Sequence, residues 1–136
     1  MPPLKDAKII IIEDDPNSYL ATIELLKLHG VSQINAFRNG TSVLEFLNTN
    51  ADPVDLFLVD IHMPGETGLD LIKRLRETSA GVDAQIVALT AGVLFEDIRR
   101  VRAAGFDGFI GKPLKPYEFP QQLERILSGE SLWEWR

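Results

Sequence analysis

The sequence predicts an α/β domain built on a mostly parallel, five-stranded sheet. Five short apolar runs alternate with five segments of helical periodicity, and the strongest runs are hydrophobic at every position instead of every second one. Such runs suit strands that are buried on both faces, with crossover helices packed on each side of the sheet. With 136 residues, 45% of them hydrophobic, the chain can bury one core, so we predict a single domain.

The apolar runs locate the strands. The first run, which ends at Ile12, is mostly isoleucine, and the third, which ends at Val59, is equally apolar. The second and fifth runs are shorter or more polar, and the fourth ends at Leu89. The predicted strands span residues 7–12, 33–37, 56–59, 85–89 and 108–110.

A helical segment follows each strand. Asp15 and Pro16 predict an N-cap and a first-turn proline for the first helix, which we expect to end near Gly30. Gly105 and Gly129 mark the ends of the fourth and fifth helices. The apolar residues at helical spacing are Leu20, Ile23, Leu25 and Leu26, then Val43, Leu44 and Leu47, then Leu69, Ile72 and Leu75, then Leu94, Ile98 and Val101, and last Phe119, Leu123, Ile126 and Leu127.

Polar residues stand where the apolar strands end. In an open parallel sheet the carboxyl ends of the strands share one edge, where ligands bind. Residues far apart in the sequence should therefore converge there, bringing together several carboxylates, a hydroxyl and an ammonium group. In chain order these residues are Glu13, Asp14, Asp15, Asp60, Thr90 and Lys112.

Clustered carboxylates predict a metal ion. Two unit charges 4 Å apart repel by about 4 kcal/mol at an effective dielectric of 20. A divalent cation that prefers oxygen ligands offsets this repulsion, and Mg²⁺ is the usual choice where a phosphate is also bound. Lys112 and Thr90 would then contact a phosphoryl group as charge and as hydrogen-bond donor. Taken alone, each residue has a structural alternative; Asp15, for example, suits a helix cap.

Five short motifs together resemble a known family. They are 9–15 (IIIIEDD), 58–65 (LVDIHMPG) with Gly68, 89–91 (LTA), 104–105 (AG) and 112–113 (KP). From about Lys8 to Leu127 the chain resembles the receiver domains of two-component response regulators, of the CheY-like single-domain type. The resemblance implies a flavodoxin-like, doubly wound sheet with strand order 2-1-3-4-5. It also implies a phosphoacceptor signalling domain, which catalyses only its own phosphorylation and dephosphorylation.

The resemblance assigns roles by position. It implies magnesium as cofactor and a histidine kinase or histidine phosphotransfer protein as phosphodonor. Small Ala91 would leave the site open to that donor. The implied roles are Asp60 as phosphoacceptor and metal ligand, Asp14 as direct ligand, Glu13 as ligand acting largely through water, the backbone carbonyl of His62 as a further ligand, Thr90 and Lys112 as phosphoryl contacts, Thr90 and Phe109 as the switch pair, and Lys112-Pro113 as a cis peptide.

Three positions depart from the commoner pattern of that family. Phe109 lacks the hydroxyl of the frequent tyrosine, so its switch excludes that hydrogen bond. His62 and Gly92 occupy positions that tune loss of the phosphoryl group in the family, which leaves the lifetime of the phosphorylated form open. His29 stands before Gly30 at a helix end, where a partly charged imidazole suits the dipole.

Composition excludes several classes of protein. The net charge of −6 and the lack of a basic patch argue against direct nucleic-acid binding, and Arg99, Arg100 and Arg102 are interpreted as a solvated helix face. With no cysteine, disulfides and thiolate chemistry are excluded. Neither a signal core nor a membrane-length apolar run stands near the start, so we expect a cytoplasmic protein.

Partners and the C-terminus complete the predictions. We divide the chain into a receiver domain, 1–129, and a tail, 130–136. The resemblance implies that the fourth helix, fifth strand and fifth helix bind a downstream protein, with Leu94, Phe95 and Tyr117 as candidates. Trp133 and Trp135 are expected to fold back onto the domain, because large exposed aromatics are normally avoided. The alternative is contact with a partner or with a second subunit in a homodimer.

Other functions fit the sequence less well. A magnesium-dependent aspartyl phosphatase would place its nucleophile after the first strand in an Asp-x-Asp tract, whereas Asp60 follows the third. A flavin-binding module needs donors at the first turn, where this chain has acids. A receiver-shaped interaction module that signals without phosphorylation would be suggested by a missing acceptor or lysine, and neither is missing.

Overall fold

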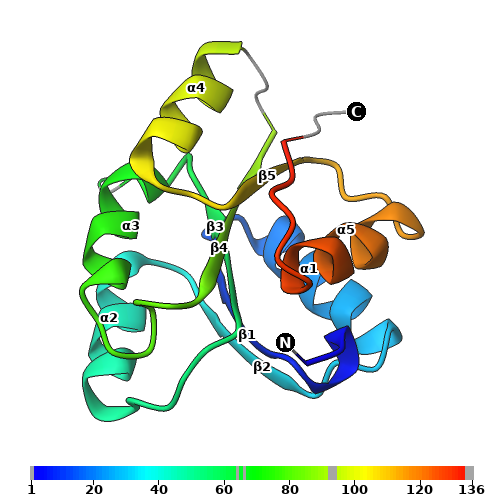
Figure 1. Cartoon of the computed structure of the whole chain (residues 1–136), viewed down its shortest axis with the longest axis horizontal. Coiled ribbons are helices and arrows are strands. Elements are labelled where there is room, and N and C mark those ends of the chain that lie inside the picture. The colour runs from blue at the N-terminus through cyan, green and yellow to red at the C-terminus, as the bar shows by residue number, and fades with distance from the viewer. Residues whose placement is uncertain (1, 64, 66, 92–94, 134–136) are drawn as a thin grey trace.

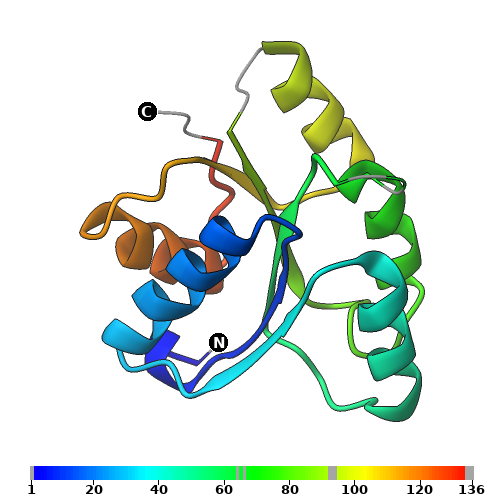
Figure 2. The ribbon, with the colours of Figure 1, turned by 180° about the vertical axis from the view of Figure 1, so that it is seen from behind.

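The computed structural model describes residues 2–63, 65, 67–91 and 95–133. It has three layers, with a central sheet between helices α1 and α5 on one face and α2, α3 and α4 on the other (Figure 1; Figure 2 shows the opposite side). A short 3-10 helix, Leu4–Asp6, precedes the first strand. Among the described residues, none of the helices is long and apolar enough to span a bilayer.

The sheet is parallel throughout and has the predicted strand order, β2-β1-β3-β4-β5. The central strand β3 is buried at every position, which explains its continuous apolar sequence. The edge strand β2 is only partly buried, which explains its mixed composition. The strands are β1 (Lys8–Ile12), β2 (Gln33–Phe37), β3 (Leu56–Asp60), β4 (Gln85–Thr90) and β5 (Gly108–Gly111).

Side-chain caps begin the first three helices. The Asp15 carboxylate accepts a hydrogen bond from the Ser18 amide at 2.9 Å, as its position before Pro16 predicts. Asn39 and Thr67 cap the next two helices in the same way. The helices are α1 (Pro16–Leu28), α2 (Gly40–Thr49), α3 (Gly68–Arg76), α4 (Phe95–Ala104) and α5 (Glu118–Leu127).

Alternate strand residues enter two separate cores. Ile10, Phe57 and Phe109 belong to the core under α2, α3 and α4, whereas Ile9 and Leu58 belong to the core under α1 and α5. Each core therefore receives one face of the same strands, so a slip of one residue in any strand would exchange the two sets. This constraint fixes the register and with it the positions of the strand ends.

The predicted elements agree with the structure, with three differences, the first being that β1 begins at Lys8 instead of Ala7. Strands β3, β4 and β5 each extend one residue further than expected, so that Asp60 and Thr90 are the last residues of their strands. Leu20 fits the helical periodicity of α1 but is 56% exposed, because α1 turns Thr22 and Leu26 toward the sheet instead. Leu94 and the side chain of Phe95 lie outside the described part of the structure.

The close approach of α3 to β3 requires glycine at position 68. A Cβ on Gly68 would lie 2.9 Å from the backbone oxygen of Asp60 and 2.9 Å from the Cα of Ile61. Such contacts force the backbone to shift, since real Cβ atoms are essentially never so close. Gly68 thus allows the helix to pack against the strand end that carries Asp60.

We predict that Gly68→Ala lowers the free energy of unfolding by about 1–3 kcal/mol, the usual cost of overpacking. Urea unfolding followed by circular dichroism measures the change. Thr41→Ala, at an exposed position in the first turn of α2, is the control and should change stability by less than about 0.5 kcal/mol. Equal stability of Gly68→Ala and the native protein would contradict the tight packing of α3 on β3.

Candidate functional site

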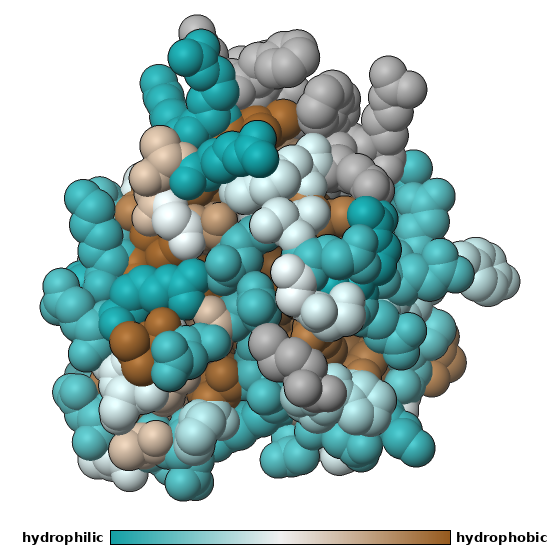
Figure 3. Space-filling model, viewed as in Figure 1, coloured by the Kyte–Doolittle hydropathy of each residue, from teal (hydrophilic) through white to brown (hydrophobic). Residues whose placement is uncertain are grey.

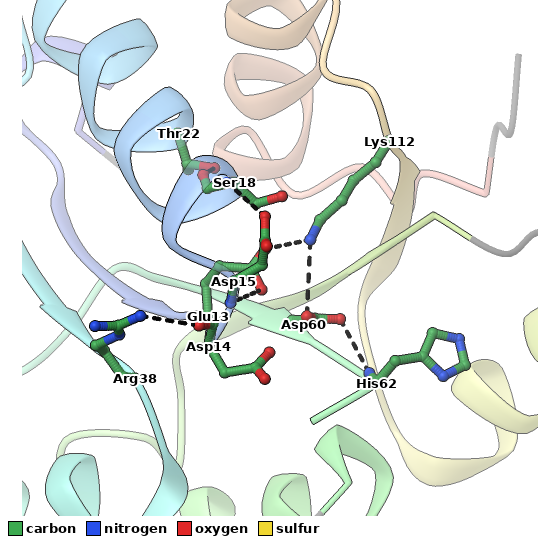
Figure 4. Close-up of polar contacts among 9 residues, drawn as sticks. All are labelled: Glu13, Asp14, Asp15, Ser18, Thr22, Arg38, Asp60, His62 and Lys112. Carbon is green, nitrogen blue, oxygen red and sulfur yellow. Dashed lines mark hydrogen bonds and ion pairs between the residues drawn. The ribbon is translucent and has the colours of Figure 1, made fainter. Parts of the chain in front are cut away.

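Carboxylates from two strands meet at one edge of the sheet. Glu13 and Asp14 follow β1, and Asp60 ends β3, which pairs with β1. Each of the three offers a carboxylate oxygen within 4.8 Å of the other two. Figure 4 shows them with Lys112, which approaches from the end of β5. The predicted convergence of strand-end residues is therefore present for Glu13, Asp14, Asp60 and Lys112.

Asp60 is the member of this cluster that ends β3. It is 6% exposed. One oxygen accepts a hydrogen bond from the backbone amide of His62 at 2.9 Å, and the other lies 3.7 Å from the Lys112 ammonium nitrogen. The amide holds the carboxylate in one orientation, while part of it stays accessible. The His62 imidazole is drawn pointing away from Asp60 (Figure 4), and the residue is exposed.

Lys112 supplies the positive charge of the site. Its ammonium forms an ion pair with Glu13 as well as the longer one with Asp60. The backbone amide of Lys112 donates to the Thr90 carbonyl at 2.8 Å, and the Lys112–Pro113 peptide bond is cis. Lys112 is therefore placed by the pairing of β5 with β4 and partly neutralises both buried carboxylates.

Glu13 is the most perturbed acid of the site. Its side chain has no exposed surface. Its pKa is raised from 4.5 to about 7, first because burial penalises the charged form and then because the Asp60 carboxylate lies beside it. Lys112 opposes the rise. A bound cation would favour the charged form of the carboxyl.

Asp14 and Asp15 have different roles although they are adjacent in the sequence. Asp15 is exposed, and hydrogen bonds from Ser18 at the start of α1 lower the pKa of its carboxyl. It thus acts as the helix cap that the sequence predicts. Asp14 is partly exposed and belongs to the carboxylate cluster. Of the acidic tract after β1, Glu13 and Asp14 therefore belong to the carboxylate cluster, and Asp15 caps α1.

Arg38 is a neighbour of the site that sequence reasoning missed. It follows β2, and its guanidinium donates to the backbone oxygen of Asp14 at 3.2 Å. It also lies over the ring of Tyr19, 5.9 Å from the centroid, and Tyr19 in turn donates to the Ala36 carbonyl. The signal was present in the sequence, because Arg38 is the first polar residue after a strand that ends at the same edge.

Thr90 lies on β4, which pairs with the strand of Asp60, and Phe109 lies on β5, the next strand beyond it. Thr90 ends β4 and is fully buried, and its strand neighbour Leu89 pairs with Asp60. Phe109 is also fully buried, in the core under α4, and pairs with Ala88. The two side chains therefore occupy the strands that connect the carboxylate cluster with the far edge of the sheet.

Comparison with known proteins identifies the family. Residues 9–124 match the response regulator receiver domain. The chain belongs to this family. It is thus a receiver domain of the two-component signalling systems, as the five motifs indicate. Receiver domains are signalling domains, and the acidic cluster of Glu13, Asp14 and Asp60 stands at the predicted position in this one.

The receiver domain also resembles parts of longer proteins. A nitrate/nitrite response regulator protein homolog of Haemophilus influenzae is 33% identical over 127 residues, which make up 90% of this chain and 58% of that protein. The sensor protein TorS of Escherichia coli is 33% identical over 120 residues, 88% of this chain and 13% of that protein. The chain therefore spans little more than half of the first relative and a small part of the second.

Solved structures show the same fold. The signal receiver domain of a signal transduction histidine kinase from Syntrophus aciditrophicus is 28% identical, with a TM-score of 0.77 and coverage of 91% of this chain and 92% of that one. The receiver domain of a sensor histidine kinase from Pseudomonas aeruginosa, solved with a magnesium ion coordinated in its active site cleft, has a TM-score of 0.79 at 24% identity. It covers 90% of this chain and 98% of that one.

The raised pKa of Glu13 predicts a pH dependence of stability without metal. The carboxyl binds its proton more tightly in the folded state, so its contribution is fully present below pH 4.5 and is lost as the pH rises to about 7. Relative to Glu13→Gln, the native protein should lose on the order of 2–3 kcal/mol over this window. Urea unfolding in a chelator at several pH values measures this difference.

Glu24→Gln, on the exposed surface of α1, is the matched control and should show no such trend relative to the native protein. A native protein that gains stability relative to Glu13→Gln as the pH rises would contradict the assignment. That result would mean that the ion pair with Lys112 outweighs burial.

Proposed function

We propose that this receiver domain accepts a phosphoryl group on Asp60 in a magnesium-dependent reaction, and that the modification changes its contacts with other proteins. The phosphodonor is a phosphohistidine of a histidine kinase or of a histidine phosphotransfer protein. The observation that carries the proposal is the juxtaposition of Asp60 with two further carboxylates and the Lys112 ammonium at one sheet edge. The family membership supports it.

The donor set fits a magnesium ion. Three carboxylates that gather within 4.8 Å offer the hard oxygen ligands this ion prefers, and the cluster remains partly open for water and a phosphate. Glu13, Asp14 and Asp60 would hold the ion, together with the His62 carbonyl that the family implies. When bound, it screens the repulsion between the Asp60 carboxylate and the oxygens of the incoming phosphoryl group.

Asp60 is the nucleophile of the proposed transfer. One of its oxygens attacks phosphorus, the new O–P bond forms as the N–P bond of the phosphohistidine breaks, and the bonding electrons return to the donor imidazole. The amide of His62 holds the carboxylate by its other oxygen. The reaction yields an acyl phosphate on Asp60 and an unmodified donor histidine.

Lys112 and Thr90 interact with the negative charge on the phosphoryl oxygens. Lys112 is already within 3.7 Å of Asp60 and exchanges its contact with Glu13 for one with the phosphoryl group. Thr90 ends the neighbouring strand and donates its hydroxyl. Movement of Thr90 frees space into which Phe109 repacks, and this alters the surface formed by α4, β5 and α5.

That surface is the proposed binding site for a downstream protein. Tyr117, at the start of α5, is 86% exposed and offers an aromatic contact. Phosphorylation adds about −1.5 to −2 charges at the sheet edge, which shifts the balance between two states of the domain and does not create a new fold. A homodimer through the same surface is a second form of this proposal.

We predict that acetyl phosphate with Mg²⁺ adds one phosphoryl group to the protein, and that Asp60→Asn abolishes the addition. The reason is that the acyl phosphate needs a carboxylate nucleophile and a screening cation. Intact mass spectrometry measures the adduct, and omission of Mg²⁺ or addition of a chelator should remove it. Beryllofluoride binding, followed by ¹⁹F NMR, detects the site if the acyl phosphate decays quickly.

Failure to bind beryllofluoride and to form an adduct would overturn the proposed function. It would favour a receiver-shaped interaction module that signals without phosphorylation. An adduct that persists in Asp60→Asn would place the phosphoryl group on another residue.

We further predict that Lys112→Ala slows phosphorylation by acetyl phosphate by about 10²-fold, because one preorganised charge contact to the phosphoryl oxygens is lost. Quench-flow mass spectrometry gives the rate. Lys115→Ala removes the same charge from an exposed position three residues away and should leave the rate within about twofold, since exposed charges are screened. Equal rates for the two variants would contradict the role of Lys112.

A further inference from the structure

The segment Ser131–Trp133, hereafter the C-terminal cover, lies alongside β5. Leu132 forms a parallel β-bridge with Gly108, and the Phe109 amide donates to the Leu132 carbonyl at 2.7 Å. Figures 1 and 2 both show the chain returning from α5 to this edge of the sheet. β5 is the outer strand of the sheet, so the C-terminal cover forms a short strand segment beside it.

Its two apolar side chains alternate as those of a strand do. Leu132 is 1% exposed and belongs to the core under α1 and α5. Trp133 packs against the other core, which contains Phe109, and the Arg102 guanidinium lies 4.9 Å from the centre of its ring. The predicted folding back of Trp133 is thus confirmed, whereas Trp135 lies outside the described residues. This alternation distinguishes strand addition from a loose contact.

The sequence of β5 accommodates the C-terminal cover. A Cβ on Gly108 would lie 2.8 Å from the Leu132 oxygen and 3.4 Å from the Leu132 nitrogen, and its three nearest atoms all belong to Leu132. Glycine at position 108 therefore permits the close approach of Leu132 to β5. In the part of the surface not drawn in grey, Figure 3 shows hydrophobic residues only in small areas among hydrophilic ones.

β5 links the C-terminal cover to the acceptor site. The Phe109 amide is bonded to the cover, and Lys112, which follows the same strand, contacts Glu13 and Asp60. A phosphoryl group on Asp60 would draw Lys112 away from Glu13, and Phe109 would repack beside the cover.

We propose that the C-terminal cover is an intramolecular ligand of the β5 edge, held while Asp60 is unmodified and released by its phosphorylation. Release opens the edge of β5 and the adjoining surface of α4 to the downstream protein, so the C-terminal cover acts as a regulatory segment. The inference rests on the proposed function, because it takes phosphorylation of Asp60 as the signal. It adds the device by which the signal reaches the protein-binding surface.

The chain contains its own reporter. Its two tryptophans are Trp133 and Trp135, so Trp135→Phe leaves Trp133 as the single strong fluorophore. Beryllofluoride with Mg²⁺ should shift the emission of Trp133 to longer wavelength and increase its quenching by acrylamide, because the indole moves into water. Asp60→Asn in the same background should show neither change.

Two variants displace the C-terminal cover without touching the acceptor site. Gly108→Ala should push Leu132 from β5 by collision, and Leu132→Asp should expel it from its core. Both should expose Trp133 without beryllofluoride and tighten beryllofluoride binding by at least about fivefold, since coupling between two sites is reciprocal and commonly of this size. Ser131→Asp adds the same charge at an exposed neighbouring position and should change neither quantity.

The outcomes separate the two proposals. If ¹⁹F NMR shows bound beryllofluoride while Trp133 stays protected and Gly108→Ala leaves the affinity unchanged, the release is overturned and the proposed function stands. If beryllofluoride does not bind and acetyl phosphate forms no adduct, both are overturned. If Trp133 is already fully quenchable in the native protein without beryllofluoride, the C-terminal cover does not hold the β5 edge and the inference fails on its own.

Discussion

The structure depends on one electrostatic constraint, which is that two buried carboxylates, Glu13 and Asp60, need a cation between them. Two such charges 4 Å apart repel by about 4 kcal/mol at an effective dielectric of 20. In the structure Lys112 meets this need by contacting both. Lys112 follows β5 directly, so β5 must pair with β4 in the one register that brings the ammonium to the acids. The same register places Gly108 and Phe109 at the outer edge of the sheet.

The carboxylates of this site can be neutralised by different cations, and the choice among them is the basis of its chemistry. Burial and the Asp60 carboxylate raise the pKa of Glu13 to about 7, and the Lys112 ammonium opposes this rise. A divalent metal ion would compete with both for the same oxygens. A site balanced in this way responds to a new negative charge by a redistribution of the cations bound to its carboxylates. In the proposed phosphoryl transfer, such a redistribution would let Lys112 leave Glu13 when an anion arrives at Asp60.

Much of the fold and site could be predicted because the relevant signals are local and agree with one another. Continuous apolar runs mark buried strands, and each chemically active residue stands at a strand end, where parallel topology brings it to a common edge. The exposure of Leu20 could not be predicted, because helical periodicity gives an apolar face but not the angle at which α1 meets the sheet. The contact of Leu132 with β5 depends on a return of the chain across α5, which no local pattern records.

The open edge of a sheet explains why a signal can be sent through so short a segment. An uncovered outer strand presents unpaired backbone groups, which invite pairing with other chains. The bond from the Phe109 amide to Leu132 satisfies one of these groups, and two apolar side chains seal the strand on either face. Because the contact involves so few residues, a modest change in β5 is enough to tip its balance, whereas the five main strands stay paired. The edge is thereby protected until the acceptor site changes, and the overall fold need not change.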